Sequence, residues 1–200
     1  MECDRLSQQM KFIAEIDNLK QVLRRTVTLG AARNENSAEH SWHIAVMAMV
    51  LAEYAEGNID LCRTIKMMLV HDLVEIYAGD TYCYDEEAGK DKVERETAAA
   101  DRIFAMLPAD QTAEFRSLWE EFEAGATAEA RFASSLDRLQ ALLLNYHTRG
   151  VTWHKHGVRR EQVIARAAPI EAGSRVLWKY ARALIDDAVA QGLLKPKGGV

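Results

Sequence analysis

Apolar residues recur along this chain at three- and four-residue intervals, which is the spacing of an amphipathic helix. The first stripe lies between residues 10 and 25 and includes Ile16 and Leu19. Asn36 and Glu39 have the spacing of a capping box at the start of the second helix. The pattern as a whole predicts helices over residues 10–25, 36–57, 60–79, 92–107, 108–125, 127–146, 159–167 and 174–191.

The interruptions between these stripes are short and contain no Ser/Gly linker, so we expect an all-α fold in a single domain of six to eight helices. Residues 80–91 and 148–158 show no helical period and are predicted to be loops. Only 11 glycines and 3 prolines occur in 200 residues, which favours helix throughout. The expected boundaries are an N-terminal extension, 1–9, a helical domain, 10–192, and a flexible C-terminal tail, 193–200.

Charge and cysteine content narrow the class of protein further. The formal net charge is −5, a sign that disfavours a nucleic-acid polymer as partner. The three cysteines, Cys3, Cys62 and Cys83, form no CxxC pair, which argues for a reducing compartment and against a thiolate zinc site. The charged N-terminus and the lack of an apolar run of about 18 residues predict a cytoplasmic protein with no membrane partner.

Charged residues interrupt the third predicted helix, which is apolar on nearly every face. His71 and Asp72 fall in the middle of it, and Glu75 follows one turn later on the same side. A carboxylate in such a helix costs several kcal/mol unless it is paired or binds a metal. These three ionisable groups therefore point to a chemical role.

Two other predicted core helices repeat this anomaly. Asp137 lies among leucines in the helix over 127–146, and His40 lies in the first turn of the helix over 36–57. With His71 and Asp72, they make a set of two imidazoles and two carboxylates, which suits a borderline-to-hard divalent cation.

Each of these residues has a simpler explanation when taken alone. A single buried histidine is more often hydrogen-bonded in the core than bound to a metal, and Asp137 could pair with Arg138 or Arg131. Their joint occurrence on the inner faces of three helices favours the metal site. His43 is either a further ligand or part of the apolar face of its helix.

The order His, His-Asp, Asp in these helices is similar to the signature of HD-domain metal-dependent phosphohydrolases. The surrounding strings resemble the branch that contains the 5′-deoxyribonucleotidases, and the resemblance extends over roughly residues 10–190. The strings that carry it are Glu35–Ser41, Val70–Asp80 and Ser135–Leu139.

This resemblance implies an HD-domain helical bundle that hydrolyses (deoxy)nucleoside 5′-monophosphates to the nucleoside and phosphate, and that commonly forms homodimers. It also implies one divalent metal ion (Mn, Co, Fe, Ni, Zn or Mg). Glu75 and Asp80 match the catalytic carboxylates of the family. The implied metal ligands are His40, His71, Asp72 and Asp137.

Phosphate binding also requires cations beyond the metal. Arg33, just before the second helix, and Arg25, at the end of the first, are the candidates, although either could be a solvated surface residue. Thr26 stands where the family can carry an aromatic residue, which puts selection of deoxyribose over ribose in doubt.

Two other functions remain open at this point. One is the same hydrolysis acting on a different small phosphorylated metabolite. The other is a non-catalytic helical binding module that keeps its metal only as a structural clamp. A second metal ion is disfavoured, because no histidine lies between Asp72 and Asp137. His154 and His156, two positions apart, are expected to lie in a solvated loop.

Overall fold

The computed structural model describes residues 2–30, 33–85 and 87–196, and these are helical over most of their length. The prediction of an all-α fold with six to eight helices is confirmed, because eight α-helices within the described residues have eight residues or more. These are α1 (Glu2–Ile16), α2 (Ser37–Leu51), α3 (Leu61–Val70), α5 (Lys92–Phe104), α6 (Ala109–Ala124), α7 (Ala128–His147), α9 (Arg160–Ala167) and α11 (Arg175–Ala190).

Shorter elements connect these helices. The short α-helices are α4 (Glu75–Ala78), α8 (Val151–His156) and α10 (Ile170–Gly173). The 3₁₀ segments are Asp17–Gln21, Ala52–Tyr54 and His71–Val74, and the two strands are β1 (Leu23–Val27) and β2 (Asn34–Asn36). No helix of the described residues has the length and apolar character needed to cross a membrane.

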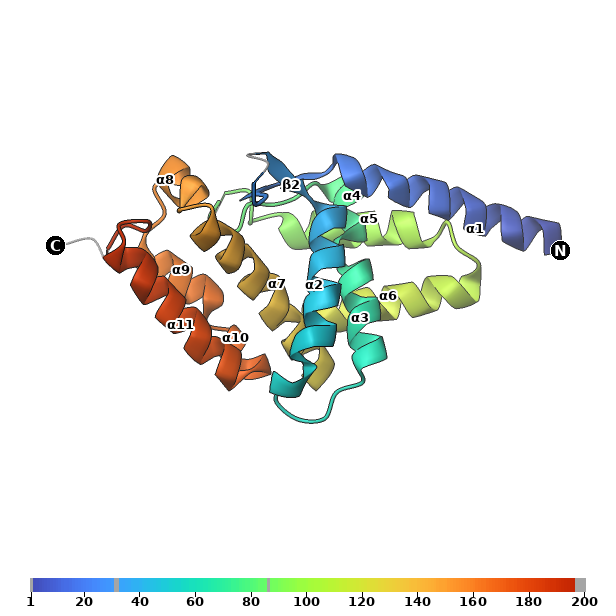
Figure 1. Ribbon diagram of the computed structural model, residues 1–200. Coiled ribbons are helices and arrows are strands. Elements are labelled where there is room, and N and C mark those ends of the chain that lie inside the picture. The colour runs from blue at the N-terminus through green and yellow to red at the C-terminus, as the bar shows by residue number, and fades with distance from the viewer. Residues whose placement is uncertain (1, 31–32, 86, 197–200) are drawn as a thin grey trace.

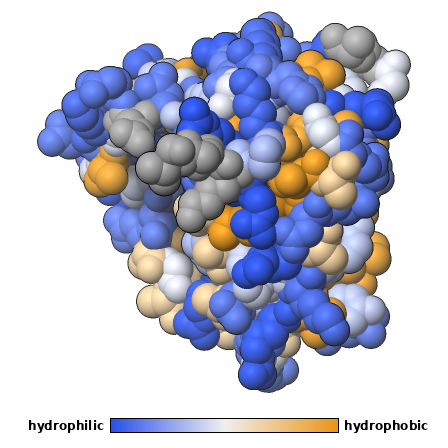
Figure 2. Space-filling view, turned by 90° about the vertical axis from the view of Figure 1, so that its left-hand side faces the viewer, coloured by the Kyte–Doolittle hydropathy of each residue, from blue (hydrophilic) through white to orange (hydrophobic). Residues whose placement is uncertain are grey.

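Helix α2 stands in the middle of the molecule and separates two groups of helices (Figure 1). On one side, α7, α9, α10 and α11 pack around a hydrophobic core that includes Ile44 of α2 and Phe132 of α7. On the other side, α1, α3, α5 and α6 surround a second core that includes Met67 and Phe104. The end formed by α9 and α11 exposes mostly hydrophilic side chains (Figure 2).

The predicted capping box fixes the start of α2. Asn36 Oδ1 accepts from the backbone N–H of Glu39 at 2.9 Å, and Glu39 Oε2 accepts from the backbone N–H of Asn36 at 3.1 Å. Two of the free N–H groups at this end are thereby satisfied. The cap sets where the first turn of α2 begins, and it therefore positions His40, which lies in that turn.

The helix predicted over 10–25 is wrong in its second half. α1 ends at Ile16, a 3₁₀ turn follows, and Leu23–Val27 forms β1, which pairs antiparallel with β2. Alternate residues of a strand face the same side, so Arg24 and Thr26 both point inward, where Thr26 is buried. An apolar stripe over so few residues does not distinguish a helix turn from a short strand.

The predicted loop over 148–158 is also wrong, because Val151–His156 forms α8 between two glycines with left-handed backbone angles. Gly150 has no room for a side chain, since a Cβ atom would lie 2.1 Å from the carbonyl oxygen of Leu193. The flexible tail predicted from residue 193 needs correction as well. Leu193 and Leu194 are buried in the core, and the backbone N–H of Arg160 donates to the Lys195 carbonyl oxygen at 3.0 Å.

The predicted N-terminal extension, 1–9, continues directly into the helical domain. Residues 2–9 are the first turns of α1, and Arg5 forms an ion pair with Asp110 of α6 at 2.7 Å. Residues 1 and 197–200 of the two predicted terminal segments lie outside the described residues.

Replacing Gly173 by alanine should lower the free energy of unfolding by about 1–3 kcal/mol, because α10 lies directly against α7. A Cβ atom at this position would lie 2.3 Å from both the Arg131 carbonyl oxygen and Ser135 Oγ. Urea titration followed by circular dichroism measures the change. Glu171→Ala, an exposed position on the same short helix, is the control and should shift the value by less than about 0.5 kcal/mol. Equal midpoints for the two variants would contradict the close packing.

Candidate metal centre

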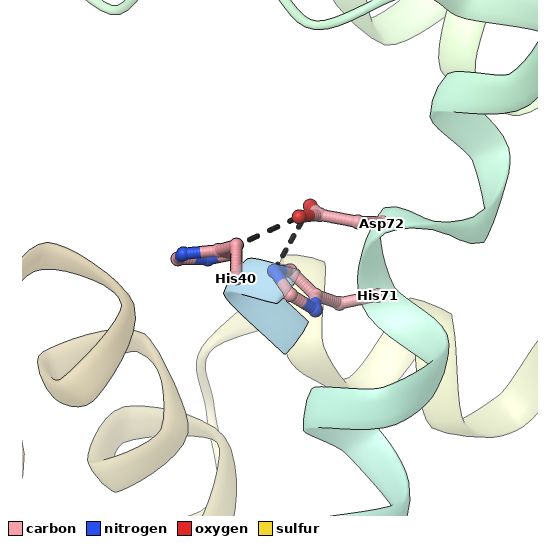
Figure 3. A group of neighbouring side chains, drawn as sticks. All are labelled: His40, His71 and Asp72. Carbon is pink, nitrogen blue, oxygen red and sulfur yellow. Dashed lines mark ion pairs between the residues drawn. The ribbon is translucent and has the colours of Figure 1, made fainter. Parts of the chain in front are cut away.

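Three of the four predicted metal ligands converge in the interior. His40, His71 and Asp72 each offer a donor atom within 4.8 Å of the donor atoms of the other two, and all three are buried. Figure 3 shows a dashed ion-pair line from the Asp72 carboxylate to each of the two imidazoles, which reach it from different elements. Asp72 Oδ1 is 2.9 Å from His71 Nε2, and its Oδ2 is 3.9 Å from His40 Nε2.

A change of helix type allows two consecutive residues to reach one point. The helix predicted over 60–79 ends as an α-helix at Val70, and His71–Val74 is wound as a 3₁₀ segment before α4 begins. A 3₁₀ stretch inside a helix often marks a hinge or a strained part of the sequence. Here it presents His71 and Asp72 to the same centre (Figure 3).

The proton of each imidazole lies on the nitrogen away from this centre. His71 Nδ1 lies 2.8 Å from the Met68 carbonyl oxygen, which can only accept, so Nδ1 carries the proton. His40 Nδ1 lies 3.0 Å from Gln140 Oε1, while the amide nitrogen of Gln140 donates to Glu35 Oε1 at 2.6 Å. The Gln140 oxygen therefore accepts the proton of His40.

The two Nε2 atoms that face the centre are consequently the ring nitrogens left to accept a cation, either a second proton or a metal ion. Both atoms are buried and have no hydrogen-bond partner among the described residues. They face carboxylate oxygens, which are also acceptors, and such a set is satisfied only by a cation. Two imidazoles and carboxylates are suitable ligands for a divalent ion, so the residues fit the predicted metal.

The pKa values of the pair His71 and Asp72 reflect the same need for positive charge. Burial disfavours a charged His71, but the neighbouring Asp72 carboxylate outweighs it and raises the pKa of His71 to about 9. Near neutral pH the metal-free protein therefore holds a second proton on Nε2 of His71, which a metal ion would replace. Burial also opposes ionisation of Asp72, yet His71 and Arg24 lower the pKa of that carboxyl to about 2. The carboxylate is therefore ionised and available as a ligand.

Asp137, the fourth predicted ligand, reaches the centre from α7. Its Oδ1 is 3.1 Å from His40 Nε2, although Asp137 lies outside the tight group of the other three. Burial raises the pKa of Asp137, but the contact with His40 outweighs it and holds the pKa well below its usual range. Its side chain is 13% exposed, so it stands where the centre meets the adjoining cavity.

Arg24 is a central residue that sequence reasoning missed. Its guanidinium lies 3.1 Å from Asp72 Oδ2, 3.6 Å from Glu35 Oε2 and 3.8 Å from Asp137 Oδ1. It neutralises carboxylates that would otherwise repel each other, and it ties β1 to the metal centre. The alternation of β1, had the strand been recognised, would have placed Arg24 inward with Thr26.

The two predicted catalytic carboxylates line a cavity beside the metal centre. Glu75 is buried at the start of α4, and Ser37 Oγ donates to its Oε2 at 2.6 Å. Burial, and then the charge of Asp72, raise the pKa of Glu75 well above its usual range. Asp80 follows Gly79, whose φ of 76° turns the chain back, and burial raises the pKa of Asp80. A carboxyl with a raised pKa is suited to proton transfer near neutral pH.

The cavity also brings together basic and aromatic side chains from distant parts of the chain. Arg25 lines it, as predicted for a residue that contacts substrate. Tyr84 and the buried Trp153 supply part of an apolar wall.

His156 was expected in a solvated loop, but it belongs to α8. Its ring lies 4.9 Å from that of Tyr82.

Arg33 is not brought to this cavity. Its guanidinium forms two hydrogen bonds with the Glu39 carboxylate, at 2.9 and 2.6 Å, and its side chain is 54% exposed. Glu39 occupies the guanidinium at the start of α2, and the role of Arg33 as a substrate contact stays a prediction. His43 is not in the tight ligand group, and its Nδ1 lies 3.3 Å from the Gln140 amide nitrogen.

A buried His/Asp centre of this kind, inside a helical domain, defines a metal-binding class of protein. The family model for the HD domain matches residues 16–178, and the chain belongs to the HD-domain family. The chain is 54% identical to a predicted metal-dependent phosphohydrolase from Magnetospirillum magnetotacticum whose crystal structure is known, with a TM-score of 0.93. That comparison covers 96% of this chain and 97% of the other.

Two animal proteins are also similar to this chain. It is 33% identical to human 5′-deoxynucleotidase HDDC2 over 135 residues, which are 67% of this chain and 65% of the human protein. It is 35% identical to the Xenopus laevis protein of the same name over 135 residues, 67% of this chain and 66% of that protein. The matched part thus spans slightly less than two thirds of either relative.

His71→Ala should abolish metal binding, because it removes one of the two bare nitrogens at the centre. Metal analysis of the purified variant by mass spectrometry measures this, beside circular dichroism to check the fold. His147→Ala is the matched control, since His147 is exposed at the end of α7 and should leave the metal content unchanged. Full metal content in His71→Ala would disprove the ligand assignment.

Proposed function

We propose that this chain is a metal-dependent phosphomonoester hydrolase that releases phosphate from (deoxy)nucleoside 5′-monophosphates. The observation that carries the proposal is the pair of bare, buried Nε2 atoms on His40 and His71, which face carboxylates beside a cavity. The same cavity contains Glu75 and Asp80, two carboxyls with raised pKa values. The names of the human, Xenopus and Magnetospirillum relatives agree with this chemistry.

One divalent ion, with Mn, Co, Fe, Ni, Zn and Mg as the candidates, is the proposed cofactor. His40, His71, Asp72 and Asp137 would hold it through their Nε2 and carboxylate oxygen atoms. When bound, such an ion would polarise a phosphoryl oxygen and lower the pKa of a bound water towards neutrality.

Glu75 and Asp80 divide the proton transfers of the hydrolysis between them. One carboxyl accepts the proton of the attacking water, and the other donates a proton to the departing 5′-oxygen of the nucleoside. The hydrogen bond from Ser37 Oγ fixes one oxygen of Glu75, and the other oxygen stays free for this exchange. Their raised pKa values keep both groups able to gain or lose a proton near neutral pH.

The cavity accommodates the substrate between its basic and aromatic walls. Arg25 contacts the phosphate, and Tyr84 and Trp153 offer an apolar surface to the sugar or base. The Thr26 hydroxyl already donates to Glu35 Oε2 at 2.9 Å. No aromatic ring stands at this position to exclude a 2′-hydroxyl, so both ribose and deoxyribose are admitted.

With a fixed metal, phosphate release should be much faster from nucleoside 5′-monophosphates than from sugar phosphates, because only the nucleotides present a base to the apolar wall. A colorimetric phosphate assay over ribonucleotides, deoxyribonucleotides and sugar phosphates measures this.

Glu75→Gln should reduce turnover by about 100-fold or more, while its metal content and melting temperature stay nearly unchanged. Glu94→Gln, an exposed position on α5, is the control and should keep full activity.

Two outcomes would favour the other functions. Equal turnover of sugar phosphates and nucleotides would remove the nucleotide preference and leave a hydrolase of another small phosphorylated metabolite. An inactive wild-type protein whose melting temperature depends on metal would favour the non-catalytic module in which the ion is a structural clamp.

We further propose a cytoplasmic homodimer. Cys62 and Cys83 are free and exposed, which suits a reducing compartment. Helix α2 carries exposed large apolar residues at helical spacing, which are Trp42, Val46, Met49 and Val50. A second copy of the chain would cover this apolar face. Trp42→Glu should therefore halve the mass measured by analytical ultracentrifugation. A wild-type monomer of 22.5 kDa would rule out the dimer.

A further inference from the structure

Arg138 of α7 and Arg166 of α9 are two more arginines that line the cavity beside the metal centre. Both lie near Asp137 Oδ2, Arg166 at 3.6 Å and Arg138 at 4.0 Å. These separations are too long for hydrogen bonds. The two guanidinium groups therefore stand next to one carboxylate oxygen without being bonded to it.

Neutralising Asp137 does not account for the pair. Oδ1 of Asp137 is already 3.1 Å from His40 Nε2 and 3.8 Å from Arg24, and the proposed metal adds further positive charge on that side. Two further arginines supply more positive charge than is needed to neutralise one carboxylate. Like charges placed this close repel each other, and an anion bound between them relieves that repulsion.

Both arginines also have unused hydrogen-bond donors. Arg138 donates from Nη1 to the Ser134 carbonyl oxygen at 2.9 Å and to Ser134 Oγ, but its buried Nε has no partner. Arg166 makes no side-chain hydrogen bond within residues 2–30, 33–85 and 87–196. Apart from Arg25, the other cavity cations are Arg24 and Lys92, and both are engaged by carboxylates, Lys92 by Glu96 at 2.8 Å.

We propose that Arg138 and Arg166 bind the non-bridging oxygens of the phosphoryl group, as substrate-binding residues in addition to Arg25. This inference rests on the proposed function. Guanidinium groups present several N–H donors in a plane, which matches the geometry of phosphate oxygens. Oδ1 of Asp137 faces His40, and Oδ2 faces the two arginines. A phosphoryl group bound by both arginines therefore lies directly beside the metal centre.

The test is calorimetric binding of the two products, inorganic phosphate and a nucleoside, to the metal-loaded protein. Arg138→Met and Arg166→Met should each weaken phosphate binding by roughly 10- to 100-fold, the effect of a lost hydrogen bond to a charged group. Nucleoside binding should stay within about threefold, because the nucleoside carries no anion for the pair.

Two arginines on the same helices serve as matched controls. Arg131→Met on α7 and Arg160→Met on α9 remove the same charge, but Arg131 bonds the Ala126 carbonyl oxygen and Arg160 pairs with Asp186, away from the cavity. Both controls should bind phosphate within about threefold of the wild type. A long-range effect of net charge would weaken all four variants alike, and that result would overturn the proposal.

The metal content of every variant is measured in parallel, because Arg166 lies close to a proposed ligand. Arg166→Lys keeps a positive charge beside Asp137 but loses the planar fork, so it should retain the metal and still bind phosphate more weakly than the wild type. If Arg166→Met loses metal, the phosphate affinities of Arg138→Met and Arg166→Lys test the proposal instead. Wild-type phosphate affinity in both of these variants would then overturn it.

Nucleoside binding that weakens while phosphate binding is unchanged would place the sugar or base at the arginines and reject the phosphate assignment. The proposed function fails separately, since a wild-type protein that binds phosphate at this pair but hydrolyses no nucleotide would refute the nucleotidase activity alone.

Discussion

The centre of this protein depends on hydrogen-bond acceptors that are held face to face. The Met68 carbonyl oxygen fixes the proton of His71 on Nδ1, and the Gln140 amide does the same for His40. The Nε2 atoms then have only lone pairs to offer to the carboxylates of Asp72 and Asp137. A buried arrangement of this kind is costly unless a cation completes it, and the surrounding structure maintains the arrangement.

Residues beyond the proposed ligands provide much of that support, and many come from the β1–β2 hairpin. Thr26 of β1 donates to Glu35 of β2, Glu35 accepts from Gln140 of α7, and Gln140 orients His40 of α2. Such outer partners set ring orientation and ligand basicity in metal sites. A small sheet in an otherwise helical protein thus connects the elements that hold the imidazoles and carboxylates.

The sequence contained enough information for the helices and the proposed ligands, but less for the rest of the site. His71, Asp72 and Asp137 stood out because charged residues are rare in apolar helices, and the Asn36 capping box located His40. The hairpin was missed because five residues of strand resemble the end of a helical stripe. The sequence could not show that Arg25 lines the cavity while Arg33 bonds to Glu39, because the Arg33–Glu39 contact depends on the conformation of the turn before α2. Arg138 and Arg166 meet only through the packing of α9 on α7.

The proposed ligands come from helices that belong to two different hydrophobic cores. His40 and Asp137 are on α2 and α7, which contribute mostly to the first core, while His71 and Asp72 join α3 to α4 beside the second. An ion held by all four therefore fastens the two halves of the molecule together. By thermodynamic linkage, saturation at 100 times the dissociation constant adds about 2.7 kcal/mol to the folded state. The concentration of free metal would thus set how readily the chain unfolds as well as whether it reacts.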